Sequence, residues 1–380
     1  MQTRRDFLRT AGWAATLGPA LLEESLRAAA RARAAAATAP DDGNLFDIEQ
    51  IAEGVYAALA RPQLLINSNA CIIVNEDEVM VVDTHSKPSA ASALISQIRR
   101  EITPKPVRYV VNTHFHWDHA QGNHAYPAAF PAGVAILASA PTRQLLLELG
   151  KRRLEQSLEG VPKQLEELRR ALEKTTDAKA QARLRELIVQ GEAYLKEMRG
   201  ASVDLPTVTF QDRLVIHKKS REIHLLFLGR GHTSGDVVVF LPEEKVVATG
   251  DLAHGFLPYI ADGFPAEWPA TLDKLRRLDF HRVSPGHGGF QEGKEMVGYF
   301  RNYLEELTGL VKAGMEKGKT VEQLQKELTP AAFKSLRADG YGDRIRANYD
   351  RFTPSFPGAP IRLEPDLANN VSHVYQKLKS

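Results

Sequence analysis

The stretch Thr113-His114-Phe115-His116-Trp117-Asp118-His119 decides how the rest of this 380-residue chain is interpreted. It places four potential metal ligands, three imidazoles and one carboxylate, within six consecutive positions. The chain contains 12 His residues, so three of them this close together argue against a surface loop that is rich in His by chance. The preceding residues 107–111 are β-branched or aromatic apart from one Arg, which is typical of a strand. Because the motif lacks a helical apolar period, we expect it to form a loop after that strand.

The spacing within this loop predicts sites for two metal ions. His114 and His116 are two residues apart, so in an extended backbone their side chains point the same way and can bind one ion. Asp118 and His119 follow the bend and can reach a second ion. Imidazole and carboxylate groups are the ligands that zinc and other first-row metals prefer.

The composition excludes some functions. Lys and Arg total 49 while Asp and Glu total 47, a net charge of +2, so no charge excess points to a nucleic-acid partner. We therefore expect a small-molecule substrate. Hydrophobic residues make up 43% of the chain, which is enough for a large core. The single cysteine, Cys71, lies in an apolar run; it cannot form an internal disulfide, and we expect it to pack in the core.

Residues 1–39 are predicted to form a targeting segment outside the folded domain. A basic region containing Arg4 and Arg5 precedes a modestly apolar stretch and then small residues, the order found in secretory signals. The paired Arg followed by Asp6-Phe7-Leu8-Arg9 resembles a twin-arginine export signal, which is read by a receptor. We expect contact with bacterial export machinery and a periplasmic or otherwise exported location. The alternative is an amphipathic helix without a targeting role.

The chain outside the motif alternates between strand and helix patterns. Residues 41–144 contain short β runs separated by turns, with an antiparallel pattern over residues 51–83. Residues 204–290 return to short strands, and residues 291–380 are mostly helical in pattern. Two sets of strands followed by helices predict an α/β (α+β) fold in which sheets pack together and helices flank them.

Residues 145–203 interrupt the strand pattern with Leu and charged residues at helical spacing. Leu165, Leu168 and Leu172 share one face of the first predicted helix. The pattern predicts an inserted hairpin of two antiparallel helices joined near residues 175–177. Its role stays open between a packing arm or homodimer contact and a lid over the metal site.

Three further candidate ligands follow predicted strands and are flanked by Gly. They are His232 in Gly231-His232-Thr233-Ser234-Gly235, Asp251 after Gly250, and His287 between Gly286 and Gly288. Glycine beside a ligand lets the backbone turn tightly and approach a metal closely. Ser234 is interpreted as a turn residue or supporting hydroxyl, not as a nucleophile. Together with the His loop, these three residues predict a two-metal site.

With these residues in this order, the chain resembles the metallo-β-lactamase superfamily. The resemblance implies an αββα sandwich with a two-metal site at one edge of the sheets, here carrying an inserted helical hairpin and a helical C-terminal extension. The implied first site is His114, His116 and His232, and the implied second site is Asp118, His119 and His287, with Asp251 bridging both ions. Asp83 matches the family's early aspartate, which supports the His loop from behind the ligands. The resemblance covers residues 51–140 and 204–290.

The implied function is a zinc-dependent hydrolase that uses a metal-bridging hydroxide to cleave an acyl bond (lactam, lactone or thioester) of a small substrate. Two Zn²⁺ are the expected cofactors, with iron or manganese as other options, and Asp118 is the expected catalytic residue. Asp251 stands where the best-known lactamases of the family have Cys, so the chain is similar to glyoxalase-II-like and lactonase-like hydrolases. The alternatives are an iron-dependent oxygenase similar to persulfide dioxygenases, a phosphodiesterase of the same fold, and a non-catalytic metal-binding protein of an export pathway.

Aromatic residues near the ligands are candidates for an apolar wall of the substrate pocket, or else for core positions. They are Trp117 within the His loop and, after Asp251, Phe256, Tyr259, Phe264 and Trp268. His85 and His254 stand next to site residues and are either proton carriers or structural residues.

Overall fold

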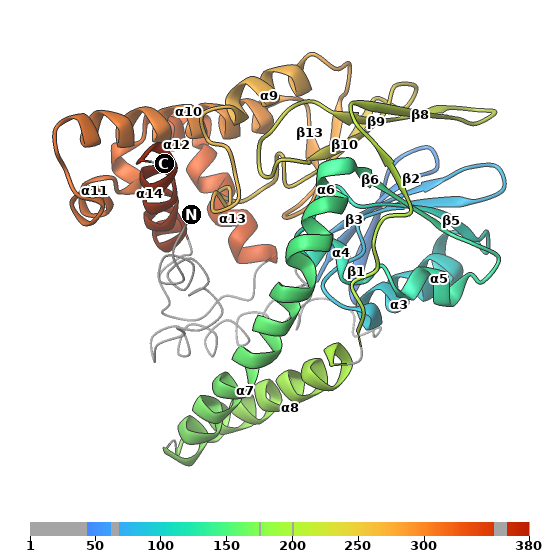
Figure 1. Cartoon of the computed structure of the whole chain (residues 1–380), viewed down its shortest axis with the longest axis horizontal. Coiled ribbons are helices and arrows are strands. Elements are labelled where there is room, and N and C mark those ends of the chain that lie inside the picture. The colour runs from blue at the N-terminus through green and yellow to red at the C-terminus, as the bar shows by residue number, and fades with distance from the viewer. Residues whose placement is uncertain (1–43, 62–67, 175, 200, 353–362, 380) are drawn as a thin grey trace.

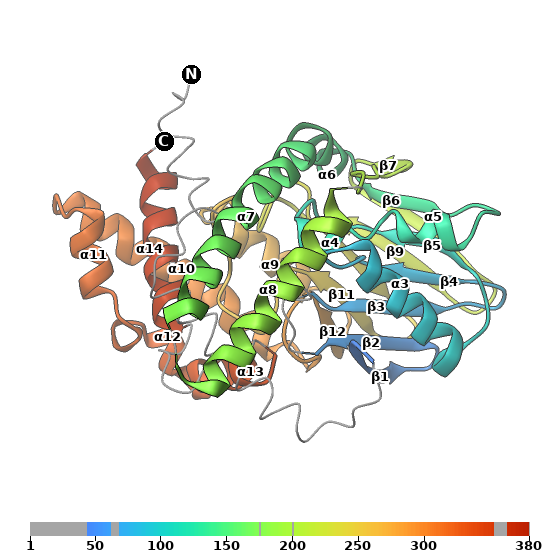
Figure 2. The same ribbon diagram turned by 90° about the horizontal axis from the view of Figure 1, so that it is seen from below.

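The computed structural model describes residues 44–61, 68–174, 176–199, 201–352 and 363–379. The predicted export segment, residues 1–39, lies outside the described residues. The two views agree that the strands gather on one side of the molecule and the C-terminal helices on the other (Figures 1 and 2).

Within the described residues, seven strands form the first sheet, in the order in which they occur in the chain. They are β1 (Phe46–Ala52), β2 (Val55–Ala60), β3 (Ala70–Val74), β4 (Val79–Val82), β5 (Val107–Val111), β6 (Ala135–Ser139) and β7 (Val208–Phe210). Neighbours from β1 to β4 are antiparallel, which confirms the pattern predicted over residues 51–83, although the sheet begins earlier than predicted. Neighbours from β4 to β7 are parallel. The His motif follows the carboxyl end of β5.

The described part of the chain forms a second sheet of six strands, in the order β13-β12-β11-β10-β9-β8. They are β8 (Arg213–His217), β9 (Glu222–Phe227), β10 (Val237–Leu241), β11 (Val246–Gly250), β12 (Arg282–Pro285) and β13 (Gln291–Glu292). β11 and β12 are parallel, so their carboxyl ends, which precede Asp251 and His287, meet at the same edge of the sheet.

Alternate side chains along the strands face two different apolar layers, as the period of two requires. Met80 of β4 and Val237 of β10 pack between the two sheets. Val79 packs under helices on the outer face of the first sheet, and Val238 packs under helices on the outer face of the second. The covering helices are α3 (Pro88–Gln97) and α5 (Ala125–Ala129) on the first sheet and α9 (Trp268–Arg276) and α10 (Glu295–Glu316) on the second. This order of layers is the αββα sandwich, which confirms the predicted fold class.

The predicted helical hairpin is present between β6 and β7. After α6 (Ala140–Leu145) and η3 (Leu146–Gly150), it consists of α7 (Lys151–Lys174) and α8 (Ala178–Met198). Leu165 of α7 and Leu184 and Leu195 of α8 are buried against one another, and Figure 1 shows the pair projecting from the sheets. At the base of the hairpin, the Glu197 carboxylate accepts hydrogen bonds from the backbone N–H and the hydroxyl of Ser89 at 2.6 and 2.8 Å. The hairpin is therefore attached to the start of α3.

The C-terminal region is helical, as predicted. Its helices are α10, α11 (Val321–Glu327), η4 (Pro330–Ala332), α12 (Lys334–Arg337), η5 (Ala338–Gly340), α13 (Tyr341–Phe352) and α14 (Leu363–Lys379). In the first half of the chain, the short helix η2 (Ile98–Ile102) follows α3. Leu367 and Val371 of α14 are buried in the same core cluster as Phe300 of α10. Among the described residues, no helix combines the length and the apolar character that a membrane span requires.

Candidate metal centre

The seven predicted metal ligands come together at one edge of the sandwich. The structure groups them in three sets whose ligand atoms lie within 4.8 Å of one another: His114, His116 and His232; His114, His119 and Asp251; and Asp118, His119 and His287. Every predicted ligand belongs to at least one set. The sets share His114 and His119, so the structure describes one continuous cluster large enough for two ions.

Part of the motif that was predicted to be a loop is helical. Trp117–Ala120 forms one helical turn, α4, and the extended backbone of His116 precedes it. A helix of four residues is too short to show an apolar period, so the sequence pattern could not predict it. The bend that was predicted between His116 and Asp118 is this change from extended to helical backbone.

The first group of ligands presents three nitrogen atoms to a common point. His116 Nδ1 lies 2.8 Å from His232 Nε2. The opposite ring nitrogen of His232 lies 3.1 Å from the carbonyl oxygen of Tyr259, and that of His114 lies 3.0 Å from Thr113 Oγ1. Among the described residues, the buried Nε2 atom of His114 has no hydrogen-bond partner. Ring nitrogens that face each other, with one left unpaired in the interior, fit a metal ion better than a hydrogen-bond network.

The second group adds two carboxylates. His287 Nε2 lies 3.2 Å from Asp251 Oδ2 and 3.4 Å from Asp118 Oδ2. His119 Nε2 lies 3.5 Å from Asp118 Oδ2 and 3.4 Å from Asp251 Oδ1. Asp251 Oδ2 is also 3.6 Å from Nε2 of His232 in the first group. Asp251 therefore faces both groups, as a bridging ligand must.

Two of the first-group imidazoles are neutral. Burial, followed by the charge of His119, holds the pKa of His114 well below its ordinary value. Burial, followed by the charge of His116, does the same for the pKa of His232. A metal ligand must present an unprotonated nitrogen, so both side chains are already in the form that binds an ion.

The second group has the opposite electrostatic character. Burial opposes a positive charge on His119, yet the carboxylates of Asp251, Asp118 and Asp83 raise its pKa to about 10. Burial also opposes a negative charge on Asp251, but the charges of His287 and then His119 hold its pKa well below the ordinary range. The buried carboxylates thus create a site that favours positive charge.

Asp83 supports the motif from behind the ligands, in the position that the sequence predicted. Its Oδ1 atom accepts a hydrogen bond from the Thr113 backbone N–H at 2.8 Å, and its Oδ2 atom accepts one from the Thr113 hydroxyl at 2.8 Å. The same Oδ2 atom lies 2.8 Å from His119 Nδ1. This contact directs the other nitrogen of His119 toward the second group, which is a common role for a carboxylate near a metal.

Glycines beside the ligands allow the strand ends to approach one another. Gly250 has a φ of +51°, and a Cβ there would lie 2.3 Å from Thr113 Oγ1. A Cβ on Gly286 would lie 2.2 Å from Asp251 Oδ1 and 2.8 Å from His119 Cε1. A larger residue would collide with Thr113 at the first position and with the ligands Asp251 and His119 at the second.

The predicted pocket aromatics occupy different environments. Tyr259 is 42% exposed, and its ring makes edge contacts with His116 and His232 at centroid distances of 5.7 and 6.2 Å. Trp117 begins α4 and is partly exposed, and Phe264 is half-buried with Arg230 over its ring at 4.3 Å. Of these three, Tyr259 is the one that is both exposed and in contact with the first ligand group.

Trp268 requires a correction, because it is fully buried and does not line an open pocket. Its indole N–H donates to the Leu252 carbonyl at 2.9 Å, and its ring contacts His232 at a centroid distance of 5.6 Å. It supports His232 from within the core. Phe256 is partly buried, and its ring stacks on Tyr349 at 4.7 Å and on the ligand His287 at 5.9 Å.

The two additional histidines that the sequence left open are neutral and internal. Burial lowers the pKa of His85 to about 3, and that ring stacks on Phe46 at 4.4 Å. Burial lowers the pKa of His254 to about 4, and its ring lies 5.5 Å from that of His287. Both side chains are buried, and the ring of His254 packs against the ligand His287. Cys71 is buried, as predicted, and burial raises the pKa of its thiol to about 12.

Two charged residues at the site were not identified from the sequence. Asp262 Oδ2 lies 2.8 Å from His116 Nε2, and Arg153 of α7 pairs with Asp262 at 2.9 Å. The local sequence carries no signal for either contact, because each depends on how distant segments fold together.

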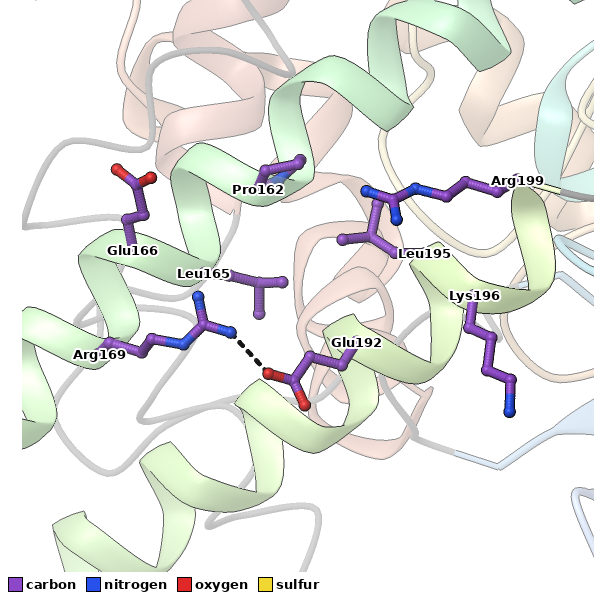
Figure 3. A pocket seen from close by; sticks show the side chains of 8 residues that line it. All are labelled: Pro162, Leu165, Glu166, Arg169, Glu192, Leu195, Lys196 and Arg199. Carbon is purple, nitrogen blue, oxygen red and sulfur yellow. Dashed lines mark hydrogen bonds and ion pairs between the residues drawn. The ribbon is translucent and has the colours of Figure 1, made fainter.

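A separate groove lies on the helical hairpin, between α7 and α8 (Figure 3). It has a volume of about 480 Å³ and is lined by Pro162, Leu165, Glu166, Arg169, Glu192, Leu195, Lys196 and Arg199. The ion pair of Arg169 and Glu192, at 2.6 Å, crosses it. None of the eight lining residues belongs to the ligand cluster, so this groove is distinct from the metal centre.

Comparison with known proteins agrees with the site. A model of the metallo-β-lactamase superfamily matches residues 65–287. The linear primary-alkylsulfatase of Pseudomonas sp. (strain ATCC 19151) is 24% identical over 311 residues, which cover 76% of this chain and 56% of that protein. The metallo-β-lactamase type 2 of Bacteroides fragilis is 21% identical over 271 residues, which cover 69% of this chain and 86% of that protein.

A solved structure supports the same fold. The metallo-β-lactamase from Pontibacter korlensis aligns with a TM-score of 0.50 and 19% identity, over 68% of this chain and 99% of that chain. The chain spans little more than half the length of the alkylsulfatase, at 56%, so that protein's substrate does not transfer directly. The family match, over more than half of the chain, shows that this chain belongs to the metallo-β-lactamase superfamily, and the cluster of His and Asp residues agrees with that membership.

Proposed function

We propose that this protein is a binuclear zinc hydrolase that cleaves an acyl bond of a small substrate, such as a lactam, a lactone or a thioester. The observation that supports this proposal most strongly is the position of Asp251. Its carboxylate lies 3.6 Å from His232 in the first ligand group and 3.2 Å from His287 in the second. One residue that serves both groups is what a pair of ions sharing a ligand requires.

The donor set fits zinc and disfavours magnesium and calcium. It contains five imidazoles and two carboxylates, drawn from His114, His116, His119, His232, His287, Asp118 and Asp251. Imidazole suits zinc and iron, whereas magnesium and calcium prefer oxygen donors alone. When bound, two such ions supply Lewis acidity and an activated water, whose pKa they lower to about 7.

The protein residues then hold and surround the reacting groups. His114, His116 and His232 would hold the first ion, while Asp118, His119 and His287 would hold the second. Asp118 is the proposed catalytic residue because its carboxylate lies within 3.5 Å of both His119 and His287. Tyr259, exposed beside the first group, offers an aromatic edge to the substrate.

A second candidate reaction is hydrolysis of a sulfate ester. The similarity to the linear primary-alkylsulfatase extends over 76% of this chain, more than the 69% covered by the lactamase of Bacteroides fragilis. The two reactions differ in the group that is attacked. Acyl hydrolysis acts on a carbonyl group, whereas the second reaction acts on a sulfate ester group. The same metal centre can serve either, so the substrate must be determined by assay.

A substrate panel separates these candidates. Zinc-loaded protein is assayed on a β-lactam, a lactone, a thioester, a phosphodiester and an alkyl sulfate, with a chelator-treated sample as control. Chelator-sensitive turnover of an acyl substrate supports the proposal, and turnover of the alkyl sulfate alone selects the second candidate. Absence of metal-dependent turnover on every substrate overturns both, and bound iron with oxygen consumption selects the oxygenase alternative.

We also propose that the protein is exported with its metal already bound. The support is the sequence of residues 1–39, in which Arg4 and Arg5 precede an apolar stretch. Expression of the full chain in a bacterium, followed by fractionation, tests this. The proposal predicts that the wild-type protein is found in the periplasmic fraction and that the variant with both Arg residues replaced by Lys is not. If the wild type and the variant both stay in the cytoplasmic fraction, the proposal is contradicted.

A further inference from the structure

An ion pair connects the helical hairpin to the metal centre. Arg153 lies in the first turn of α7, and its Nη2 atom is 2.9 Å from Asp262 Oδ1 and 3.0 Å from Asp262 Oδ2. Asp262 Oδ2 in turn lies 2.8 Å from Nε2 of His116. A continuous polar chain therefore runs from the hairpin to a candidate metal ligand.

The contact with Asp262 determines which nitrogen of His116 is free to bind an ion. A carboxylate accepts a hydrogen bond, so Asp262 holds the proton on Nε2 of His116. In the neutral ring, which is the form that binds a metal, this leaves Nδ1 without a proton, and Nδ1 is the atom that lies 2.8 Å from His232 Nε2. Carboxylates in this position fix the tautomer and the ring orientation of a histidine ligand.

Arg153 contacts the ligand motif in a second way. Its guanidinium carbon lies 4.7 Å from the centroid of the Phe115 ring, and Phe115 stands between the two ligands His114 and His116. Phe115 is buried in a small apolar cluster with Leu146 of η3. The start of the hairpin therefore touches both the partner of His116 and the backbone segment that carries it.

The ion pair is partly shielded from solvent. The side chains of Arg153 and Asp262 are 34% and 23% exposed, whereas fully exposed pairs contribute little to stability. Burial raises the pKa of Asp262, but the hydrogen bond and charge of His116 and the charge of Arg153 hold it well below the ordinary value. Two groups of α14, His373 and Lys377, also interact electrostatically with Asp262, so Arg153 is not the sole cation near it.

We infer that Asp262 and Arg153 are positioning residues for the first metal site: Asp262 orients His116, and Arg153 holds Asp262 in place from the helical hairpin. The hairpin is thus a structural part of the metal centre. This inference rests on the proposed metal centre and deepens it. The inferred role of the hairpin differs from a homodimer contact and from a lid that moves over the metal site.

Metal binding tests the inference without a substrate. The full chain is stripped of metal, and zinc affinity is measured by competition with a chromophoric chelator for the wild type and for Asp262→Asn, Arg153→Gln and Arg153→Lys. Arg169→Gln is the matched control, because Arg169 lies on the same helix and pairs with Glu192 at 2.6 Å, away from the ligands. Thermal unfolding of each variant without metal checks that the fold is retained.

Loss of an outer carboxylate partner typically weakens metal affinity by roughly 10- to 100-fold, and we expect Asp262→Asn to fall in that range for one of the two ions. Arg153→Gln should weaken the same ion several-fold, Arg153→Lys should recover part of the loss, and Arg169→Gln should match the wild type. Cobalt-substituted Asp262→Asn and Arg153→Gln should also show altered visible absorption bands, because the geometry around His116 changes.

The outcomes distinguish this inference from the proposed function. If the wild type binds no metal, the proposed function fails. If the wild type binds two ions, but Asp262→Asn and Arg153→Gln match its zinc affinity and its cobalt spectrum, the positioning role alone is overturned. Should Arg153→Gln fail to fold, the comparison of Asp262→Asn and Arg153→Lys with Arg169→Gln decides the question in the same way.

Discussion

Asp251 Oδ2 lies 3.2 Å from Nε2 of His287, at the point where the parallel strands β11 and β12 end side by side. Both residues are delivered by the backbone of neighbouring strands, so their proximity is a consequence of the sheet register. The same carboxylate also faces His232. This relationship joins the two ligand groups into one centre, and the predictions below depend on it.

Replacement of Asp251 by Ala should remove the ligand common to both groups. We expect metal content to fall below two ions per chain, and activity to fall by more than the roughly 10- to 100-fold that loss of an outer partner causes. His287→Ala is the comparison, since it should release the second ion and leave the His114, His116 and His232 group intact. Metal analysis after dialysis measures both, and full retention of two ions by Asp251→Ala would contradict the bridging role.

Replacement of Asp83 by Asn should weaken metal binding while leaving the ligands in place. Asp83 orients His119 through a contact of 2.8 Å and accepts two hydrogen bonds from Thr113. The expected loss of zinc affinity is roughly 10- to 100-fold, measured by chelator competition. An affinity equal to that of the wild type would show that the His motif is held by other contacts.

Gly286→Ala should disturb the centre sterically. The added Cβ would lie 2.2 Å from Asp251 Oδ1, so the ligand must move, and overpacking of this kind costs about 1–3 kcal/mol. Gly309→Ala is the matched control, because a Cβ on Gly309 in α10 meets nothing within 4 Å. The unfolding temperature and the metal content should both fall for Gly286→Ala and not for Gly309→Ala. Equal values for the two variants would refute the close approach of Gly286 to Asp251.

Metal binding should release protons at neutral pH. The pKa of His119 is raised to about 10 by surrounding carboxylates, so the metal-free protein holds a proton there that an incoming ion must displace. A raised histidine pKa stabilises the metal-free fold fully below the unfolded value of about 6.5, and this contribution is lost as pH rises through about 10. Because fewer molecules carry the competing proton on His119 as the pH rises, metal affinity should increase from pH 7 toward a pH of about 10.

Calorimetry provides the measurement for this pH dependence. Zinc is titrated into metal-free protein in two buffers that differ in ionisation enthalpy, and the difference in apparent enthalpy gives the number of protons released. Equal enthalpies in both buffers, or an affinity independent of pH above neutrality, would show that His119 is unprotonated before the metal binds.

Tyr259→Ala should impair substrate binding more than metal binding. Tyr259 is exposed and meets His116 and His232 through its ring edge, so removal of the ring should raise KM while metal content stays unchanged. Tyr259→Phe keeps the ring and should resemble the wild type. A Tyr259→Ala variant with unchanged KM would exclude this face from the substrate pocket.

The sandwich and the ligand set could be predicted from the sequence because their signals are local. Each ligand follows a β run, and Gly250 and Gly286 stand where the structure leaves no room for a Cβ. The one-turn helix at Trp117–Ala120 escaped prediction because four residues cannot show a period.

Asp262 and Arg153, unlike Asp83, could not be predicted because their contacts join distant segments. Asp262 is 146 residues from His116, and Arg153 is 109 residues from Asp262. Trp268 was assigned to the pocket because it follows Asp251 closely, but α9 turns it into the core beneath His232. The export signal and a homodimer contact through the hairpin stay predictions.

Metal analysis combined with turnover tests the central claim most directly. Protein produced with zinc in the medium is freed of loosely bound ions, analysed for every first-row metal, and assayed on the acyl and sulfate-ester panel before and after chelation. We predict two zinc ions per chain and hydrolysis that is lost on chelation and restored by zinc. A single bound iron with oxygen consumption, or hydrolysis that persists without metal, would contradict a binuclear zinc hydrolase.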